Sequence, residues 1–395
     1  MSSAAPLAGL KVVDLTRHLP GPLCARLLVD LGARVIKIEE PRLGDPVRLT
    51  PPLVDGTGAL AALLLSGLES VALDLKKADA REVLMGLLAD ADVLLESFRP
   101  GTLARLGLPP EDLRERFPKL VLASISGWGQ DGPYAARAGH DLTYQALAGT
   151  LSTGQMPAVP AADLVGAWSA LSAVLAALVA RERTGQGTWI DAALYDAGVH
   201  ANVVGWAFAR GGPASGGGLL SGALPCYQLY RTRDGAQLAF APLEEHFFRR
   251  FLEAAGAPEL APLQYRQDAE AQRTLGALIA RHTLAEWQTR LVGLDLPIEP
   301  VLDAAAAAAH PQAQARGLLR TARDGLYRLA FPARFDGQRP SVAERVPDIG
   351  GDTRRHLVAL GGRFIALGPF ARRKAGIGRR ASLERWVKRV LLRRR

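Results

Sequence analysis

Cysteine is nearly absent from this chain of 395 residues. Cys24 and Cys226 lie far apart and outside any CxxC or Cys/His spacing, which argues against a disulfide framework and a structural zinc site. We expect both to be buried thiols. No run of 18 or more apolar residues occurs, and the first ten residues lack the basic and hydrophobic regions of a signal peptide. The sequence therefore predicts neither a membrane span nor secretion, and we expect a cytoplasmic location.

The glycine fingerprint of dinucleotide-binding proteins is also missing. Leu10–Thr16 is an expected strand, and the turn after it carries Pro20, Gly21 and Pro22 instead of GxGxxG. The hypothesis that the protein is an NAD-dependent oxidoreductase therefore has little support.

A basic surface is absent from most of the chain, although the net charge is +9. Residues 371–395 hold eleven Lys or Arg and one Glu, a net of +10, so residues 1–370 sum to −1. The body carries no basic stripe interleaved with aromatic residues, and we expect no nucleic-acid partner for it.

What the sequence does contain is a regular alternation of strands and helices. Hydrophobic residues make up 48% and the mean hydropathy is +0.07, which is ample for a buried core. The expected strands are Leu10–Thr16, Val35–Ile38, Val71–Lys76, 92–98 and Leu120–Trp128, with helical segments between them. This pattern predicts an α/β fold with an open, doubly wound parallel sheet that binds ligands at the carboxyl ends of its strands.

The second half of the chain predicts a smaller domain. Trp168–Gly187 has the pattern of a long helix, Ser215–Gly222 is a glycine-rich linker, and Asp234-Gly235 is a hairpin turn. We expect a large domain over 1–200, a linker over 201–222, a small α/β domain over 223–328, a return to the large domain over 329–368 and a tail over 369–395.

The stretch from Gly139 to Gly166 carries the groups that carbon-acid or acyl-transfer chemistry needs. Imidazole has an ordinary pKa near neutrality, so His140 could accept or return a proton. Asp163 has apolar and small neighbours, and partial desolvation would raise its pKa and its nucleophilicity. The alternative is that His140 and Asp141 form an ordinary turn or helix cap.

Arg99 lies in ESFRPG, at the carboxyl end of an expected strand. A guanidinium beside a helix start suits an anion such as phosphate. A solvated loop arginine fits the sequence equally well.

Several of these segments, in this order, resemble the family III CoA-transferases, which include the α-methylacyl-CoA racemases. The matching motifs, spread over Leu7–Gly362, are LKVVDLT, PGPLCARLLVDLGARVIKIEEPRLGDPVR, LDLK, ESFRPG, SISGWGQDGPY, AGHDLTY, ADLVG, LAALVARERTGQG, YRTRDG and DIGGDTRRHLVALG. The resemblance implies a Rossmann-like large domain, a smaller α/β domain and an interlocked homodimer. It also implies an acyl-CoA substrate, with coenzyme A entering as part of the substrate and with no permanently bound cofactor or metal.

The resemblance further implies which residues hold coenzyme A. The candidates are Lys76, Arg99, Gly139, Asp141 and Tyr144, with Arg34 and Lys37 as further phosphate contacts.

Two chemistries share this scaffold. In racemases a His and an Asp flank C2 of the acyl group and exchange its proton, and His140 and Asp163 match them; Glu244 matches a residue that orients the His. In transferases the Asp forms an anhydride and then a CoA thioester. We expect C2 epimerisation of a 2-methylacyl-CoA, with CoA transfer to a carboxylic acid through Asp163 as the alternative. Two features keep that alternative open. The sequence ADLVG around Asp163 resembles that of the transferases, and the bulky Trp168 could narrow the acyl pocket.

The tail lies beyond the resemblance. Leu383, Trp386, Val387, Val390 and Leu391 recur at helical spacing among Arg and Lys, which predicts a basic amphipathic helix. Such a helix could pack on the body, lie on an anionic membrane surface or dock on an acidic partner.

Overall fold

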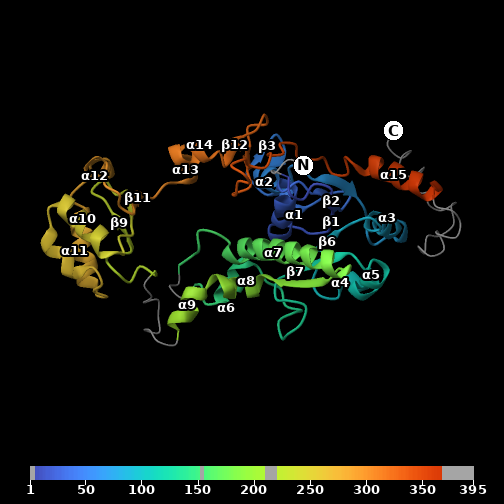
Figure 1. Cartoon of the computed structure of the whole chain (residues 1–395), viewed down its shortest axis with the longest axis horizontal. Helices are drawn as coiled ribbons and strands as arrows, with labels where there is room; N and C mark the ends of the chain where they lie inside the picture. Colours follow the sequence, from blue (N-terminus) through green and yellow to red (C-terminus); the bar gives the residue numbers. More distant parts are fainter. Residues whose placement is uncertain (1–4, 152–154, 210–219, 367–395) are drawn as a thin grey trace. The chain divides into compact units, whose positions relative to one another are not determined.

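The computed structural model describes residues 5–151, 155–209 and 220–366 (Figure 1). The chain forms two compact units. The first comprises Met1–Ala148, Pro157–Ala201 and Ala315–Arg395, and the second comprises Gly149–Met156 and Asn202–Gln314. The chain thus returns to the first unit at Ala315, earlier than the expected 329. The predicted amphipathic tail and Gly216–Gly218 of the predicted linker lie outside the described residues.

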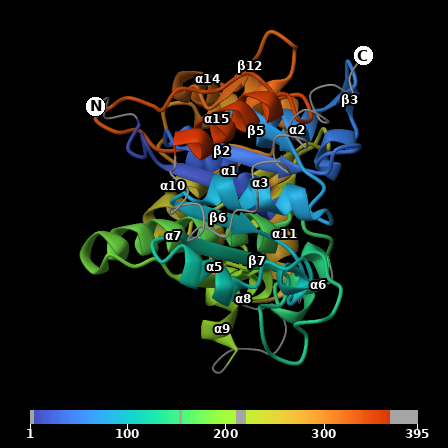
Figure 2. The ribbon, with the colours of Figure 1, turned by 90° about the vertical axis from the view of Figure 1, so that its right-hand side faces the viewer.

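A six-stranded parallel sheet is the centre of the first unit. Its strands are β1 (Lys11–Asp14), β2 (Arg34–Glu39), β5 (Glu69–Ala72), β6 (Val93–Glu96), β7 (Val121–Ser126) and β8 (Trp189–Ala193). Their spatial order is β5-β2-β1-β6-β7-β8, and every pair is parallel. The labels β5, β2, β6 and β7 follow one another down Figure 2 in this order. This is the doubly wound arrangement that the sequence predicts.

Both faces of the sheet are buried. Val12 belongs to the core under α1 (Pro20–Asp30) and α7 (Ala161–Thr184), whereas Val13 belongs to the core under α3 (Ala78–Leu88) and α15 (Thr353–Ala366). Successive residues of a strand point to opposite faces, so a strand covered on both sides is apolar throughout. The predicted strand segments are apolar for this reason.

Helix α7 is long and apolar enough to cross a membrane by length and composition alone. Its residues Ala162, Ala167, Ala170, Leu171 and Val174 are buried in the core shared with α1 and β7. The helix starts at Ala161, seven residues before the predicted Trp168, and Pro160 is the residue just before its first turn. Asp163 therefore lies in the first turn of a long core helix.

Shorter elements complete the first unit. They are the 3-10 helix Pro46–Leu49, β3 (Leu53–Val54), β4 (Thr57–Gly58), α2 (Ala59–Leu65), α4 (Thr102–Arg105), α5 (Pro110–Arg116), α6 (Asp141–Leu147), α8 (Leu194–Ala201), β12 (Leu319–Thr321) and β13 (Tyr327–Leu329). Residues 331–337, whose sequence FPARFDG resembles a strand, form only an isolated bridge between Phe335 and Gln338.

The second unit is a three-stranded antiparallel sheet with helices. The strands β9 (Gln228–Arg231), β10 (Gln237–Phe240) and β11 (Ile298–Pro300) lie in the order β11-β10-β9. Asp234 and Gly235 form the turn between β9 and β10, as predicted. The helices are α9 (Val203–Phe208), α10 (Glu245–Ala255), the 3-10 helix Pro258–Leu263, α11 (Ala269–Ile279), α12 (Leu284–Leu291), α13 (Ala304–Ala309) and α14 (Pro311–Arg316). The last two residues of α14 belong to the first unit. Trp287 is fully buried in this unit's core. Cys226 here and Cys24 in α1 are both free and buried, as expected.

Candidate active site

A pocket of about 280 Å³ opens at the carboxyl ends of β1, β6 and β7 in the first unit. Chain connections leave β1 and β6 in opposite directions, so this is the topological switch point of the sheet, where open α/β sheets bind ligands. The lining residues are Arg17, His18, Pro20, Ser97, Phe98, Arg99, Pro100, Ile125, Ser126, Gly127, Trp128, Ala135, Arg137, Ala138, Gly139, His140, Tyr144, Asp163 and Leu194. His140 and Asp163, 23 residues apart in the sequence, thus line the same pocket.

His140 is the residue before the first turn of α6. Its backbone caps the helix: the His140 N–H donates to Thr143 Oγ1 at 3.1 Å, and its carbonyl accepts from the Thr143 hydroxyl at 2.7 Å. The imidazole of His140 is exposed and lines the pocket. The capping interpretation is confirmed, and the catalytic role of the His140 ring stays a prediction.

Asp163 is partly buried beside another carboxylate. Burial, and to a lesser degree the negative charge of Asp141, raise the pKa of Asp163 from 3.8 to about 7. Asp141 is held in place because one oxygen accepts from the Asp163 N–H at 3.0 Å and the other from Gln145 Nε2 at 2.6 Å. Asp141, a predicted coenzyme A contact, thus binds the start of α7, and its charge helps to raise the pKa of Asp163.

Tyr144 forms a wall of the pocket, and two glycines make room for it. A Cβ on Gly127 would lie 2.2 Å from the Tyr144 hydroxyl oxygen, and a Cβ on Gly139 would lie 2.5 Å from its ring. The ring also meets Trp128 edge to face at 4.8 Å. Burial, with the nearby charge of Asp163, raises the pKa of Tyr144 to about 12, so the phenol stays protonated.

Two further donors on this wall were not predicted from the sequence. Ser126, at the end of β7, is 5% exposed, and its Oγ has no partner among the described residues. The indole Nε1 of Trp128 is buried and equally without one in that part of the chain. A buried donor without a partner carries a desolvation cost that a ligand can remove. The motif SISGWGQ at a strand end was the signal available in the sequence.

Of the predicted coenzyme A contacts Arg99 and Lys76, only Arg99 lines the pocket. Arg99 is exposed, lines the pocket and has no ion-pair partner among the described residues. The turn that carries it is fixed by Glu96, which accepts from the Phe98 N–H at 2.7 Å and whose pKa burial raises to about 7. Lys76 is exposed on the loop after β5, outside the residues that line the pocket.

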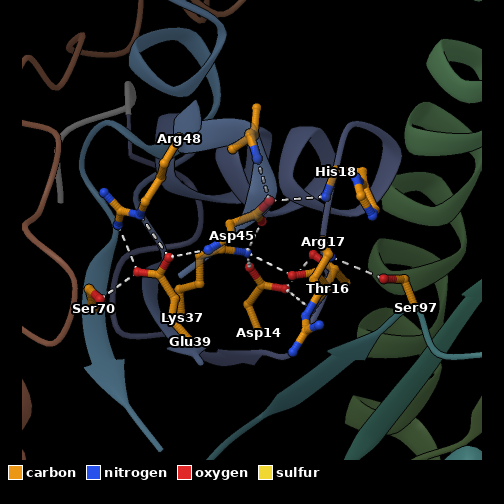
Figure 3. A network of polar contacts seen from close by, with 11 residues as sticks. Asp14, Thr16, Arg17, His18, Lys37, Glu39, Asp45, Arg48, Ser70 and Ser97 are labelled. Carbon is orange, nitrogen blue, oxygen red and sulfur yellow. Dashed lines mark hydrogen bonds and ion pairs between the residues drawn. The ribbon is translucent and has the colours of Figure 1, made fainter. Parts of the chain in front are cut away.

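The structure contradicts the expectation that Lys37 contacts the phosphates of coenzyme A. Its side chain is 1% exposed, and its Nζ pairs with Asp14 at 3.1 Å and Asp45 at 3.0 Å and donates to the Thr16 carbonyl at 2.8 Å (Figure 3). With all three partners buried around it, this ammonium group is not available to a phosphate.

The structure also contradicts the expectation that Arg34 is a phosphate contact. It is the first residue of β2, at the amino end of a parallel strand and therefore at the edge of the sheet opposite the pocket. Its guanidinium binds both oxygens of Glu69, at 3.0 and 3.1 Å.

Neither Glu244 nor Trp168 is among the residues that line this pocket. Glu244 belongs to the second unit, where it is exposed at the start of α10, and its predicted role of orienting His140 stays a prediction. Trp168 is 37% exposed on α7 and packs against Phe331 at 5.9 Å between ring centres, and its effect on an acyl pocket stays a prediction.

Known proteins share this architecture and much of the sequence. Over 334 residues the chain is 33% identical to the acetyl-CoA:oxalate CoA-transferase of Acetobacter aceti, covering 80% of this chain and 85% of the relative. It is also 33% identical over 333 residues to human alpha-methylacyl-CoA racemase, covering 80% and 83%. The crystal structure of a CAIB/BAIF family protein from Brucella suis superimposes with a TM-score of 0.80 at 30% identity, covering 90% of this chain and 100% of that one. Residues 7–353 match the sequence model of CoA-transferase family III, and the chain belongs to that family.

Proposed function

We propose that this protein epimerises C2 of a 2-methylacyl-CoA by proton removal and return through His140 and Asp163. The observation that carries the proposal is that an exposed imidazole and a carboxyl group with a pKa of about 7 line one pocket. An acid poised near neutral pH serves as proton donor or acceptor with nearly equal ease. That property suits a reaction that runs in both directions over the same two groups.

The proton balance is simple. In one direction neutral His140 removes the C2 proton, the C–H electrons form an enolate, and the carboxylic acid of Asp163 delivers its proton to the opposite face. In the other direction the carboxylate of Asp163 removes the proton and the imidazolium of His140 returns one. Each turnover leaves His140 and Asp163 with their protonation states exchanged, and proton exchange with water restores the starting states.

The enolate needs donors aimed at the thioester oxygen, because the C2 proton is far less acidic than either side chain. The Ser126 hydroxyl and the Trp128 indole are the proposed donors, since both line the pocket and both are buried without a partner in the described part of the chain. Arg99 is the proposed contact for the phosphates of coenzyme A.

Deuterium incorporation tests the proposal. With 2-methylbutanoyl-CoA in deuterated water and no added carboxylic acid, we expect deuterium at C2. His140→Ala should lower the rate at least about 100-fold, the smallest factor usual for a general acid or base. His200→Ala is the matched control, because His200 is an exposed histidine in α8 outside the residues that line the pocket, and it should leave the rate unchanged.

CoA transfer through Asp163 is the second candidate, supported by the acetyl-CoA:oxalate CoA-transferase relative at the same identity as the racemase. There the Asp163 carboxylate attacks the thioester carbonyl, the C–S bond breaks, and a mixed anhydride forms with release of the CoA thiolate. The thiolate attacks the Asp163 carbonyl of this anhydride, which releases the donor acid as a carboxylate and leaves an aspartyl-CoA thioester. The acceptor carboxylate then displaces the thiolate to give a second anhydride, and attack of the thiolate on its acyl carbonyl yields the new acyl-CoA and restores the Asp163 carboxylate. Product that requires an added carboxylate, without deuterium at C2, would decide for transfer. Hydroxylamine present during turnover would then leave a hydroxamate on Asp163, detectable by peptide mass spectrometry.

A further inference from the structure

The loop after β1 holds a residue in an unusual backbone conformation. His18 has φ of +70°, in the left-handed region that only a few per cent of non-glycine residues adopt, histidine, asparagine and aspartate more often than the others. Such conformations persist only where the surrounding structure imposes them, and they cluster at functional sites. His18 lines the pocket that contains His140 and Asp163.

A buried ionic network imposes this conformation (Figure 3). The His18 N–H donates to Asp45 Oδ1 at 3.1 Å, and that oxygen also accepts from the Val47 N–H at 3.1 Å. The other oxygen of Asp45 pairs with Lys37 Nζ at 3.0 Å. The side chain of Asp45 is fully buried and that of Lys37 is 1% exposed. The network therefore fixes a backbone amide from inside the protein.

The residues on either side of His18 are fixed as well. Asp14 Oδ1 accepts from the Thr16 N–H at 2.8 Å and from its hydroxyl at 2.6 Å. The Arg17 N–H donates to Ser97 Oγ at 3.0 Å, which joins this loop to the one after β6. The amides of Arg17 and His18 are thus already bonded, so what the loop offers a ligand is its side chains.

Burying this network is costly in solvation. A buried ion pair often contributes no more stability than apolar residues of the same size would. A network that combines this cost with a strained backbone is better explained by what it positions than by the stability it adds. In Figure 3 the imidazole of His18 points away from Asp45, out of the network.

We propose that His18 is a further ligand-contacting residue of the pocket, and that the buried Asp45–Lys37 pair is the positioning device that holds it there. The inference rests on the proposed function only for the identity of the ligand, an acyl-CoA thioester.

Two substitutions of His18 test the contact without disturbing the backbone. Glycine and asparagine both accept φ of +70°, so His18→Gly and His18→Asn remove the imidazole and keep the loop. We expect each to lower kcat/KM and the calorimetric affinity for 2-methylbutanoyl-CoA about tenfold, with an unchanged or higher Tm. Values within twofold of the wild type would overturn the contact.

A double-mutant cycle tests the positioning. Asp45→Asn keeps an oxygen for the two amides but removes the charge that faces Lys37. In the wild-type background it should lower kcat/KM, and in the His18→Gly background it should have no further effect, because it acts through His18. Additive losses would overturn the positioning role. Should Asp45→Asn fail to fold, Asp45→Ser replaces it in the same cycle, since its hydroxyl oxygen can also accept from a backbone amide.

Failure of the proposed reaction and failure of the His18 contact give different results. A wild-type protein that binds 2-methylbutanoyl-CoA without turning it over overturns the proposed reaction, and the affinities of the His18 variants still decide the contact. A wild-type protein that binds no acyl-CoA overturns both.

Discussion

The raised pKa of Asp163 predicts a specific effect of Asp163→Asn on stability. The folded protein holds the Asp163 proton up to about pH 7, whereas the unfolded chain loses it near the ordinary value of 3.8. In this window the folded state binds more protons than the unfolded state, so wild-type stability falls as the pH rises from about 4 to about 7 and levels off above it. Asparagine does not titrate, so the variant escapes this loss.

The expected gain follows from the size of the shift. At 1.36 kcal/mol per pKa unit, the advantage of Asp163→Asn over the wild type should grow by about 3 kcal/mol between pH 5 and pH 8. Folded Asp163 is already neutral at pH 5, so losing its negative charge at the amino end of α7 matters only at pH 8, where it subtracts up to about 1 kcal/mol and leaves most of the growth.

Urea unfolding of both proteins at pH 5 and pH 8 measures the difference, provided that the slope m is unchanged. Asp112→Asn is the control: Asp112 is an exposed carboxylate in the first turn of α5, and its replacement should give nearly the same small difference at both pH values. An Asp163→Asn advantage that is equal at pH 5 and pH 8 would show that the pocket does not desolvate this carboxyl group. The role of Asp163 as a proton donor near neutral pH would then fail.

Three further outcomes are expected. Gly139→Ala should destabilise the protein by about 1–3 kcal/mol in urea unfolding and weaken acyl-CoA binding, because its Cβ would lie 2.5 Å from the buried ring of Tyr144. Arg99→Gln should raise KM for acyl-CoA at least about tenfold with little change in kcat, since a phosphate contact is made equally in the ground and transition states; an unchanged KM would remove Arg99 from the binding site. Although burial works to raise the pKa of Glu69, its hydrogen bond with His356 helps to lower it to about 2, so Glu69→Gln should destabilise the protein at pH 7 and lose this effect as the pH falls from about 4.5 to 2.

The sheet was predictable because its residues leave little choice. Short apolar runs between helical segments gave the parallel strands, and the rule for doubly wound sheets gave the edge at which the pocket opens. The same reasoning, applied one step further, would have placed Lys37 correctly. Lys37 lies between Ile36 and Ile38 in a strand covered on both faces, where a lysine must be buried and paired.

Other features depend on contacts between distant segments. That the rings of His140 and Tyr144 share a pocket with Asp163 follows from how α6 packs against α7, which no local pattern encodes. The conformation of His18 depends on Asp45, 27 residues away. The β12–β13 hairpin was missed although Asp324-Gly325 is a common hairpin turn, because the strands on either side are only three residues long.

The two glycines beside Tyr144 have a consequence for substrate range. They are needed for the volume of an aromatic ring rather than for backbone freedom, because neither has a positive φ. Evolution cannot widen this side of the pocket by trimming Gly127 or Gly139, which have no side chain left to lose. A smaller side chain at position 144 would open a recess bounded by both glycines, which makes this tyrosine the natural place to engineer tolerance for a branched or bulkier acyl group.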